Sequence, residues 1–556
     1  MLTRRDFLQV AAATALIPGA ALASPRITQD ALLAFKPVGQ VTLLAFTDLH
    51  AQLMPLWYRE PAINLGSGED KGLVPHLAPK AMMAAYGLKP GSAEAYAFTA
   101  DDFVALARTY GRVGGLDRLA TLVRAIRAER PGKTLLIDSG DTWQGSYTAL
   151  QTAGADMVEA QNLLGVEAMT AHWEFTYGED RVKELIGRLA CPFLAGNVKD
   201  TEWEDDVFAA AATFERGGVK IAVIGQAFPY TPVANPRWQM PHWSFGIREE
   251  EMQKRVDAAR ADGADLVVVA SHNGFDVDRK MAGRVKGIDV ILTGHTHDAI
   301  PAVVQVGSTL LVAPGSHGKF LARLDLEVRD KRVIGHSFRL IPVLADVIRP
   351  DPDMAALIGR LRAPHEAELG RVVGRTKGLL SRRGNFNGGF DDLLCQAMLA
   401  ERDAEIALSP GFRWGAALLP GEAITAEAIY NQTAITYPVT YRTEMTGALL
   451  KDILEDVADN LFHPDPYYRQ GGDMVRLGGL SFAIDPAAAM GSRLSDLRLV
   501  RDGRPLDAGR SYVVSGWASV TEGTQGPPIW EVVMNHLGHH PEIDLPAAPL
   551  VRVIGR

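Results

Sequence analysis

Carboxylate and imidazole side chains recur at the ends of short apolar runs in the first half of this 556-residue chain. Asp48 and His50 form an Asp-x-His pair directly after one such run. Four further residues have the same placement: Asp141, His272, His295 and His297. Mixed carboxylate and imidazole ligands suit manganese, iron or zinc, and the absence of cysteine from these motifs argues against a thiolate site. Two such metals with a bridging carboxylate can activate a water for attack on a tetrahedral phosphoryl or sulfuryl centre.

The apolar runs that carry these residues have the character of buried strands in an α/β sheet. They are short, rich in β-branched residues and followed by polar or glycine-containing loops: residues 40–46, 134–137, 219–224, 266–270 and 288–292. Amphipathic stretches at 115–130 and 249–261 are predicted helices. Because ligands gather outside the carboxyl ends of strands in open α/β sheets, we expect these loops to converge.

The length of the chain requires more than one domain. We expect a leader at residues 1–23, a catalytic domain at 24–345, a linker helix at 346–372 and a second α/β domain at 373–556. An insertion at about residues 52–112 separates the Asp-x-His pair from the next helix. Connections are usually far shorter, so this segment is either functional or disordered, and its methionines and tyrosines argue against plain disorder.

The N-terminus carries the strongest targeting signal. Residues 3–8 read Thr-Arg-Arg-Asp-Phe-Leu, a twin-arginine pattern, and an apolar stretch leads to the small-residue site at 21–23. The sequence therefore predicts twin-arginine export to the periplasm and a mature chain that begins near Ser24; an apolar N-terminal helix of the mature fold is the alternative. No other apolar run approaches the length of a membrane span.

Charge and cysteine content narrow the partners and the redox chemistry. The net charge is −9, and no basic stripe with interleaved aromatic residues indicates nucleic-acid binding. The chain has two cysteines, Cys191 and Cys395, in different predicted domains and apolar surroundings. We expect two buried free thiols, with a disulfide in an oxidising compartment as the alternative.

The motifs together resemble the two-domain 5′-nucleotidase branch of the calcineurin-like metallophosphoesterases, over nearly the whole mature chain. The resemblance implies an α/β protein in which a four-layer α/β/β/α domain is followed by a nucleotidase-type C-terminal α/β domain. By position it implies two ligand sets that share one carboxylate. The first set is Asp48, His50, Asp141 and His297, and the second is Asp141, His172, His272 and His295.

One motif departs from that branch. Nucleotidases carry Gly-Asn-His-Glu-Phe-Asp, where this chain has His172 at the metal-binding Asn, and Trp173 and Thr176 at the catalytic His and Asp. A ribose alkoxide needs help from a proton donor to leave. A thiolate or persulfide does not, since a free thiol has a pKa of about 8.5. A centre that keeps both metals without the pair therefore suits an S–SO3 linkage; an inactive relative is the alternative.

The string at 172–178, the leader and the insertion together closely resemble the Sox sulfur-oxidation B component, a family of dimanganese thiosulfohydrolases. The resemblance implies two Mn2+, with Zn2+ among the other metals that the ligands suit. It also implies release of sulfate from a cysteine-bound thiosulfonate on the Sox YZ carrier protein. Arg413, His172 and Asp141 are then the catalytic candidates.

Two other functions stay open at this point. A periplasmic 5′-nucleotidase or related phosphohydrolase is one, and Trp173 and Thr176 count against it. A non-catalytic, metal-stabilised binding module is the other, and full biological activity of an Asp141→Asn variant would favour it. Sulfate release from a thiosulfonated carrier distinguishes the hydrolase from both.

The second predicted domain supplies candidates for substrate binding. Residues 408–415 resemble the nucleotidase segment whose Arg binds substrate, so Arg413 could hold a sulfonate through its planar fork. The remaining candidates for contact with substrate are Arg382, Arg383, Asn385, Trp173, Tyr437 and Trp517. A pair of solvated surface charges is the alternative for Arg382 and Arg383. Asp138 and Glu174 resemble groups that orient ligands.

Overall fold

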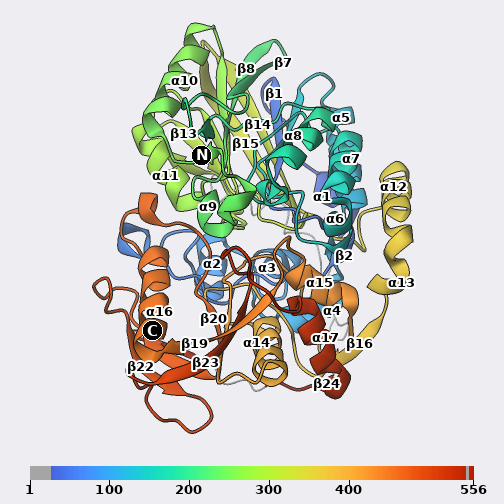
Figure 1. Ribbon diagram of the computed structural model, residues 1–556. Helices are drawn as coiled ribbons and strands as arrows, with labels where there is room; N and C mark the ends of the chain where they lie inside the picture. The colour runs from blue at the N-terminus through green and yellow to red at the C-terminus, as the bar shows by residue number, and fades with distance from the viewer. Residues whose placement is uncertain (1–26, 546–549, 556) are drawn as a thin grey trace.

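The structure is a computed structural model that describes residues 27–545 and 550–555. The predicted leader at 1–23 lies outside this part of the chain. In Figure 1 most strands and helices up to residue 342 form an upper tier, and those of the C-terminal part form a lower one; the helices of the insertion at about 52–112 lie beside the lower tier. The connecting segment runs along one side as α12 (Pro352–Arg362), a 3-10 turn (Ala363–His365) and α13 (Glu366–Leu369).

Two mixed sheets form the centre of the upper tier. The first has the order β15-β14-β1-β4-β5, with bounds Arg332–Pro342, Phe320–Arg329, Val41–Phe46, Thr134–Asp138 and Ala168–Met169. The second has the order β12-β13-β11-β10-β8-β7, with bounds Val304–Val306, Thr309–Val312, Val290–Thr293, Leu266–Ser271, Val219–Gln226 and Ala211–Arg216. Each predicted strand is present, with ends within two residues of the expected ones.

Alternation along the strands explains why the two sheets stack. In β1, Leu43 belongs to the apolar core shared by both sheets, while its neighbour Leu44 faces the helical layer on the other side. Val268 and Val267 of β10 divide in the same way. Because successive side chains point to opposite faces, fully apolar strands must be covered on both.

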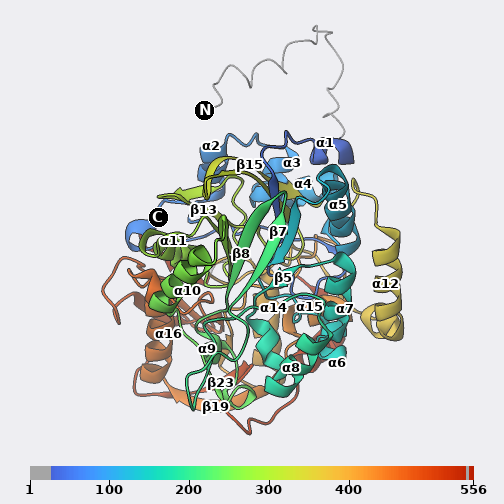
Figure 2. The ribbon, with the colours of Figure 1, turned by 90° about the horizontal axis from the view of Figure 1, so that it is seen from above.

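Helices cover the two outer faces and complete the predicted four-layer α/β/β/α arrangement. Figure 2 shows one group beside the first sheet and the other beside the second. The first group is α5 (Leu116–Glu129), α6 (Tyr147–Thr152), α7 (Ala155–Leu164) and α8 (Glu179–Arg188). The second is α10 (Glu249–Ala261) and α11 (Phe275–Arg284). The helices predicted at 115–130 and 249–261 are therefore present.

The insertion at about 52–112 is ordered and contacts the C-terminal part. It contains β2 (Pro55–Leu56), α2 (Pro79–Tyr86), α3 (Ala93–Phe98) and α4 (Phe103–Tyr110), and β2 pairs with β3 (Val113–Gly114). The Ala417 N–H donates to the Trp57 carbonyl at 2.7 Å, and the Leu65 N–H donates to Oδ1 of Asn385 at 2.7 Å. The long connection thus ties the two tiers together.

The C-terminal part is built on a four-stranded sheet with the order β19-β23-β17-β20, bounded by Thr440–Thr446, Ser511–Trp517, Ile406–Ser409 and Arg476–Gly478. Two three-stranded sheets flank it, β18-β16-β24 (Ala423–Thr425, Val372–Thr376, Glu542–Ile543) and β22-β21-β25 (Leu494–Leu499, Leu480–Ile484, Val551–Val553). Its helices are α14 (Gly389–Glu401), α15 (Ala426–Thr433), α16 (Gly447–Leu461) and α17 (Ile529–His539).

The cysteines and the longest helices bear on two further predictions. Cys191 and Cys395 are both free and buried, as expected. Burial raises the pKa of Cys191 to about 12, so its thiol is not a nucleophile at neutral pH. Within the described ranges, no helix combines the length and apolar content that crossing a bilayer requires.

Candidate metal centre

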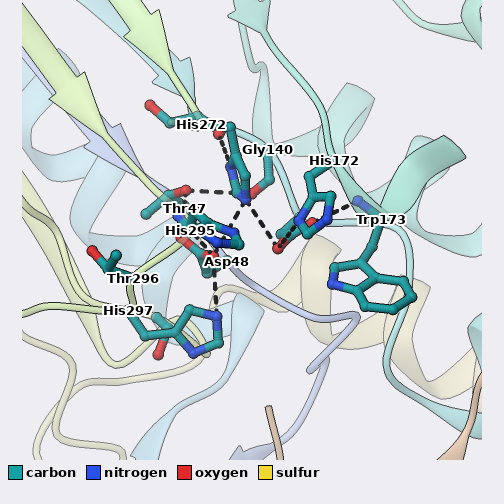
Figure 3. A network of polar contacts seen from close by, with 12 residues as sticks. Thr47, Asp48, Gly140, His172, Trp173, His272, His295, Thr296 and His297 are labelled. Atoms are coloured by element: carbon teal, nitrogen blue, oxygen red, sulfur yellow. Dashed lines mark hydrogen bonds and ion pairs between the residues drawn. The ribbon is translucent and has the colours of Figure 1, made fainter. Parts of the chain in front are cut away.

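Seven carboxylate and imidazole side chains meet where the strands of both sheets end. They form two groups that share Asp141, and these are the two sets that the motif positions imply. The first group is Asp48, His50, Asp141 and His297, and the second is Asp141, His172, His272 and His295. Figure 3 shows imidazoles from several different loops pointing toward one another around this point. All seven side chains are buried.

Each ligand is placed by the loop that follows a strand. Asp48 and His50 follow β1, Asp141 follows β4, and His295 and His297 follow β11. All five have positive φ, between 47° and 72°. Left-handed backbone costs on the order of 1–3 kcal/mol for a residue with a side chain, and such strain clusters at functional sites. The sharp turns aim adjacent side chains at one point rather than along the strand.

Asp141 lies between the imidazoles of both groups. Its Oδ2 is 3.0 Å from Nε2 of His272, 3.2 Å from Nδ1 of His172 and 3.7 Å from Nε2 of His50. Its Oδ1 accepts the N–H of Trp173 at 2.7 Å, which fixes the orientation of the carboxylate. A carboxylate in this position can bridge two cations.

Asp48 forms the second anionic corner of the site. Its Oδ1 lies 3.1 Å from Nε2 of His297, and that nitrogen is 3.0 Å from Nε2 of His50. The backbone N–H of His295 donates to the same carboxylate at 3.0 and 3.1 Å. Nε2 of His50 and Nε2 of His297 thus lie side by side next to this carboxylate, where all three groups could bind one cation.

Electrostatics favour positive charge in this cluster. Burial lowers the pKa of His50 and His172, and lowers that of His295 well below its usual range. Neutral imidazole is the form that binds metals. For His272, burial also lowers the pKa, but the charges of Asp141 and Asp48 outweigh it and raise the pKa to about 10. The two carboxylates thus favour a positive charge at the position of His272.

Several ring nitrogens of the cluster are buried and have no hydrogen-bond partner among the described residues: Nδ1 of His50 and His297, and Nε2 of His172, His272 and His295. An unpaired buried polar atom costs about 1–3 kcal/mol. Of these atoms, Nε2 of His272 faces Asp141, so a cation there would remove its cost, whereas His50, His172 and His297 face the carboxylates with their other ring nitrogen. Two sets of nitrogen and oxygen donors that share one carboxylate fit two divalent metals. The absence of thiolate and the mixed donors suit manganese, iron or zinc.

A buried carboxylate holds the two loops that meet at Asp141. Glu174 accepts four backbone N–H groups: Thr142 at 2.6 Å, His172 at 2.8 Å, and Asp141 and Trp143 at 3.3 Å. Asp138 accepts the N–H of Gly140 at 2.9 Å and the hydroxyl of Thr142 at 2.6 Å. Both residues therefore act on the ligands through the backbone, as outer groups of metal sites do.

A cavity of about 260 Å³ opens onto this cluster between the two tiers. The upper tier contributes five of the seven ligands (His50, Asp141, His172, His295 and His297) together with Trp173, Phe228, Val233 and Ala234. The C-terminal part contributes Phe412, Arg413, Trp414, Val457, Asn460, Gln470, Asp473 and Val475 with several glycines. One wall is aromatic: Trp173 lies 5.0 Å from Trp414 and 5.3 Å from Phe412, edge to face, between ring centroids. The cavity thus joins polar ligands to an apolar wall.

Arg413 and Trp173, both predicted to contact substrate, line this cavity. Nη1 of Arg413 donates to the carbonyl of His295 at 3.2 Å, and Nη2 donates to that of Gly472 at 2.6 Å. Its Nε lies 3.8 Å from Asp473. The guanidinium is therefore held beside the second ligand group, where it can meet an anion.

Arg383 and Asn385 lie near the metal cavity but not in its wall. They line an adjoining cavity of about 70 Å³, which shares Arg413 and His295 with the first. Arg383 donates to the carbonyl of Thr296 at 2.8 Å. The structure thus brings them to the far side of Arg413.

Three other predicted contact residues lie elsewhere. Arg382 is buried and donates to Asp391 at 2.9 Å and to the carbonyl of Gln432 at 2.9 Å, so it belongs to the C-terminal core. Tyr437 and Trp517 pack behind the aromatic wall, where the Trp517 indole N–H donates to Ser409. None of the three lines either cavity. The Arg382–Arg383 pair is not a solvated surface pair either, since both side chains are buried.

Sequence reasoning missed two aromatic residues that back the ligands. The Phe228 ring lies 4.0 Å from that of His295 and 4.2 Å from that of His172. The Trp414 ring stacks on that of His50 at 5.6 Å. Phe228 follows β8, so the strand-end rule could have found it, and Trp414 adjoins Arg413 in a segment already singled out.

Comparisons with known proteins place this geometry in context. The family model for the 5′-nucleotidase C-terminal domain matches residues 372–532. The solved sulfate thiohydrolase SoxB from Thermus thermophilus, in complex with glycerol, is 37% identical with a TM-score of 0.90. The match covers 94% of this chain and 98% of that one. A 5′-nucleotidase precursor, also from Thermus thermophilus, is 21% identical with a TM-score of 0.73, which is a likeness of fold, and covers 93% of this chain and 100% of that one.

Curated relatives extend the same likeness at lower coverage. The 5′-nucleotidase of Rattus norvegicus is 26% identical over 330 residues, which span 54% of this chain and 57% of that protein. The human 5′-nucleotidase is 24% identical, over 52% of this chain and 54% of that protein. The chain thus matches little more than half the length of these relatives.

Proposed function

The chain belongs to the SoxB family, and from this membership we propose that it hydrolyses the S–SO3 bond of a cysteine S-thiosulfonate on a carrier protein and releases sulfate. The fold is that of a 5′-nucleotidase-type hydrolase with a cluster suited to two metals. The proposal is supported by one observation above all. The cavity keeps the metal-binding residues, and none of the described residues that line it is placed to protonate a leaving group.

Trp173 and Thr176 occupy the positions of the catalytic His and Asp of nucleotidases, and neither can donate a proton to a leaving group in the cavity. Trp173 has its indole in the aromatic wall. Thr176 is turned away, with its hydroxyl 2.7 Å from that of Thr436. Apart from the ligands, the acid–base groups lining the cavity in the described part of the chain are Arg413 and Asp473. Asp473 forms ion pairs with Arg413 and Arg476, at 3.8 and 3.1 Å.

Such a site selects leaving groups that depart as anions. An alkoxide requires a general acid, whereas a persulfide leaves with its electron pair. In the proposed step the oxygen of a water forms a bond to the sulfonate sulfur, and the S–S bond breaks. The products are sulfate and the carrier persulfide, and two protons pass to solvent. No oxidant or reductant is needed.

The residues of this chain divide the work of that step. The two ligand sets would hold divalent metals, which supply Lewis acidity and an activated water when bound. Arg413 neutralises charge on the sulfonate oxygens through its fork. Trp173 and Trp414 give the sulfur chain an apolar, polarizable wall and exclude water from the leaving persulfide.

Sulfate release tests the proposal. Purified protein loaded with Mn2+ is given a peptide that carries a cysteine S-thiosulfonate, and sulfate is measured alongside phosphate released from AMP. We expect sulfate release at a rate far above that from the nucleotide. Brisk phosphate release without sulfate would show a nucleotidase instead, and activity in neither assay would favour a binding module.

The metal, the partner and the location belong to the same proposal. We propose manganese as the resident metal because membership of the SoxB family implies it, and the carboxylate and imidazole ligands accept manganese as well as iron or zinc. The carrier would be the Sox YZ protein, whose cysteine-bearing arm would enter the cavity beside Arg413. Export by the twin-arginine route to the periplasm is tested by sequencing the N-terminus of the exported protein, with a start near Ser24 expected.

A further inference from the structure

His317 is a buried histidine that belongs to neither ligand set. It lies between β13 and β14, has a φ of 57°, and donates its backbone N–H to the Asp48 carbonyl at 2.8 Å. Its ring lies 5.4 Å from that of His50 and 5.6 Å from that of His297. It is therefore packed directly behind the first ligand group.

The hydrogen bonds of His317 define where its proton lies. Nε2 accepts the backbone N–H of Gly415 at 3.1 Å, and a backbone N–H can only donate. The ring proton is consequently on Nδ1, which donates to Oγ of Ser316 at 2.9 Å. That hydroxyl in turn donates to the Tyr58 hydroxyl at 2.9 Å. One chain of bonds thus links the insertion, the catalytic part and the C-terminal part.

This series of hydrogen bonds ends at Gly415, in the segment that also carries Arg413. Residues 411–416 have no regular secondary structure, and Arg413 lies two positions before Gly415. Gly415 has a φ of 134°, and a Cβ there would lie 2.1 Å from Oε1 of Gln432. A side chain therefore does not fit at this position, and its absence lets the Gly415 backbone pack closely on Gln432. A functional group on an irregular segment keeps its position only where such neighbours hold the segment.

We propose that His317 is a positioning residue that sets the distance between Arg413 and the metal ligands. By accepting the Gly415 N–H, it anchors the 411–416 segment against the loop that carries Asp48 and His50. The inference rests on the proposed function, because it assigns Arg413 to the sulfonate. It adds a residue that touches neither substrate nor metal.

Three variants separate this role from simple packing. His317→Phe keeps the size of the ring but removes the acceptor, and His317→Gln keeps an acceptor oxygen. His336→Phe, an exposed position on β15, is the matched control. For each we would measure kcat/KM on the thiosulfonated peptide, the bound metal per chain, and deuterium uptake of the peptide spanning residues 411–417.

We expect His317→Phe to lower kcat/KM about tenfold, as loss of one buried hydrogen-bond acceptor should, with unchanged metal content and faster deuterium uptake at 411–417. His317→Gln should recover kcat/KM to within about threefold of the wild type. In an Arg413→Ala background the same His317→Phe change should cost less than about twofold, because two residues that act through one contact are not additive. His336→Phe should match the wild type throughout.

Several results would overturn the inference. They are a His317→Phe variant within about twofold of the wild type, an equal further loss in the Arg413→Ala background, or a loss of rate that follows loss of metal. A wild-type protein that releases no sulfate would count against the proposed function instead. Deuterium uptake then decides alone: unchanged uptake in His317→Phe refutes the anchor, and faster uptake that His317→Gln reverses supports it.

Discussion

Replacing Glu174 by Gln should weaken metal binding without touching a metal ligand. Oε1 accepts the N–H groups of Thr142 and Trp143, and Oε2 accepts those of His172 and Asp141. A glutamine presents one oxygen and one NH2 group, so it can accept only one of these pairs and sets a donor against the other. The substitution also removes the charge that strengthens the bonds that remain.

The size of the effect follows from those bonds. Each pair contains one short and one long charge-assisted hydrogen bond, and bonds of this kind contribute about 1.5–3 kcal/mol when short. Loss of one pair should cost about 3 kcal/mol if the loops stayed rigid. Because the loops carrying His172 and Asp141 can relax, we expect metal affinity to fall by about 10–100-fold, the range found for outer groups of metal sites.

A chelator competition measures this affinity directly. Mn2+ binding to the Glu174→Gln protein would be titrated against a chelator of known affinity, with circular dichroism to show that the variant is folded. Glu327→Gln, at a partly exposed position on β14, is the matched control and should bind as the wild type does. A folded Glu174→Gln protein whose Mn2+ affinity lies within about threefold of the wild type would refute the reasoning.

Three other predictions follow from the site. Phe228→Ala removes the ring that packs against His172 and His295. We therefore expect about tenfold weaker binding of one of the two metals. A metal stoichiometry that stays near two at limiting Mn2+ would contradict this. Arg413→Ala should lower kcat/KM about tenfold or more, and Arg413→Lys should recover little of the loss, since a lysine cannot make the two parallel hydrogen bonds of a guanidinium. Equal rates for the wild type and both variants would remove Arg413 from the site. Burial alone would raise the pKa of Asp276, but His76 and Arg469 lower that pKa below its ordinary value. The carboxylate therefore stabilises the fold above its unfolded-state pKa of about 4 and loses that contribution as the pH falls further. Acid unfolding of Asp276→Asn should be less steep below pH 4, and an unchanged profile would show that the ion pairs of Asp276 with Arg469 and His76, at 2.5 and 2.8 Å, contribute nothing.

Much of the metal centre could be predicted because it depends on one rule. Parallel strands of an α/β sheet end on one edge, so Asp48 and Asp141 had to converge beyond the first sheet, and His272 and His295 beyond the second. The two groups meet because the sheets stack. The same rule explains the accuracy of the strand ends, since β-branched runs and glycine-containing loops mark them locally. His172 was found differently, by its position in a motif, because β5 has two residues and leaves little pattern.

The substrate side was harder to predict because it depends on contacts between distant segments. Arg382 and Arg383 are neighbours, yet one enters the C-terminal core and the other lies against Thr296, which no local pattern distinguishes. The stacking of Trp414 on His50 requires the two tiers to be docked. Likewise, the composition of the insertion indicated that it is ordered, but not which residues it contacts, because those residues lie several hundred positions away.

The source of the oxygen in the product tests the central claim most directly. The Mn2+-loaded protein would turn over a thiosulfonated carrier peptide in water labelled with 18O, with mass spectrometry of both products. Attack of water on the sulfonate sulfur predicts sulfate with one labelled oxygen, formed in equal amount with peptide persulfide. Thiosulfate as the product, or sulfate without label, would contradict the proposal that this centre cleaves the S–SO3 bond by hydrolysis.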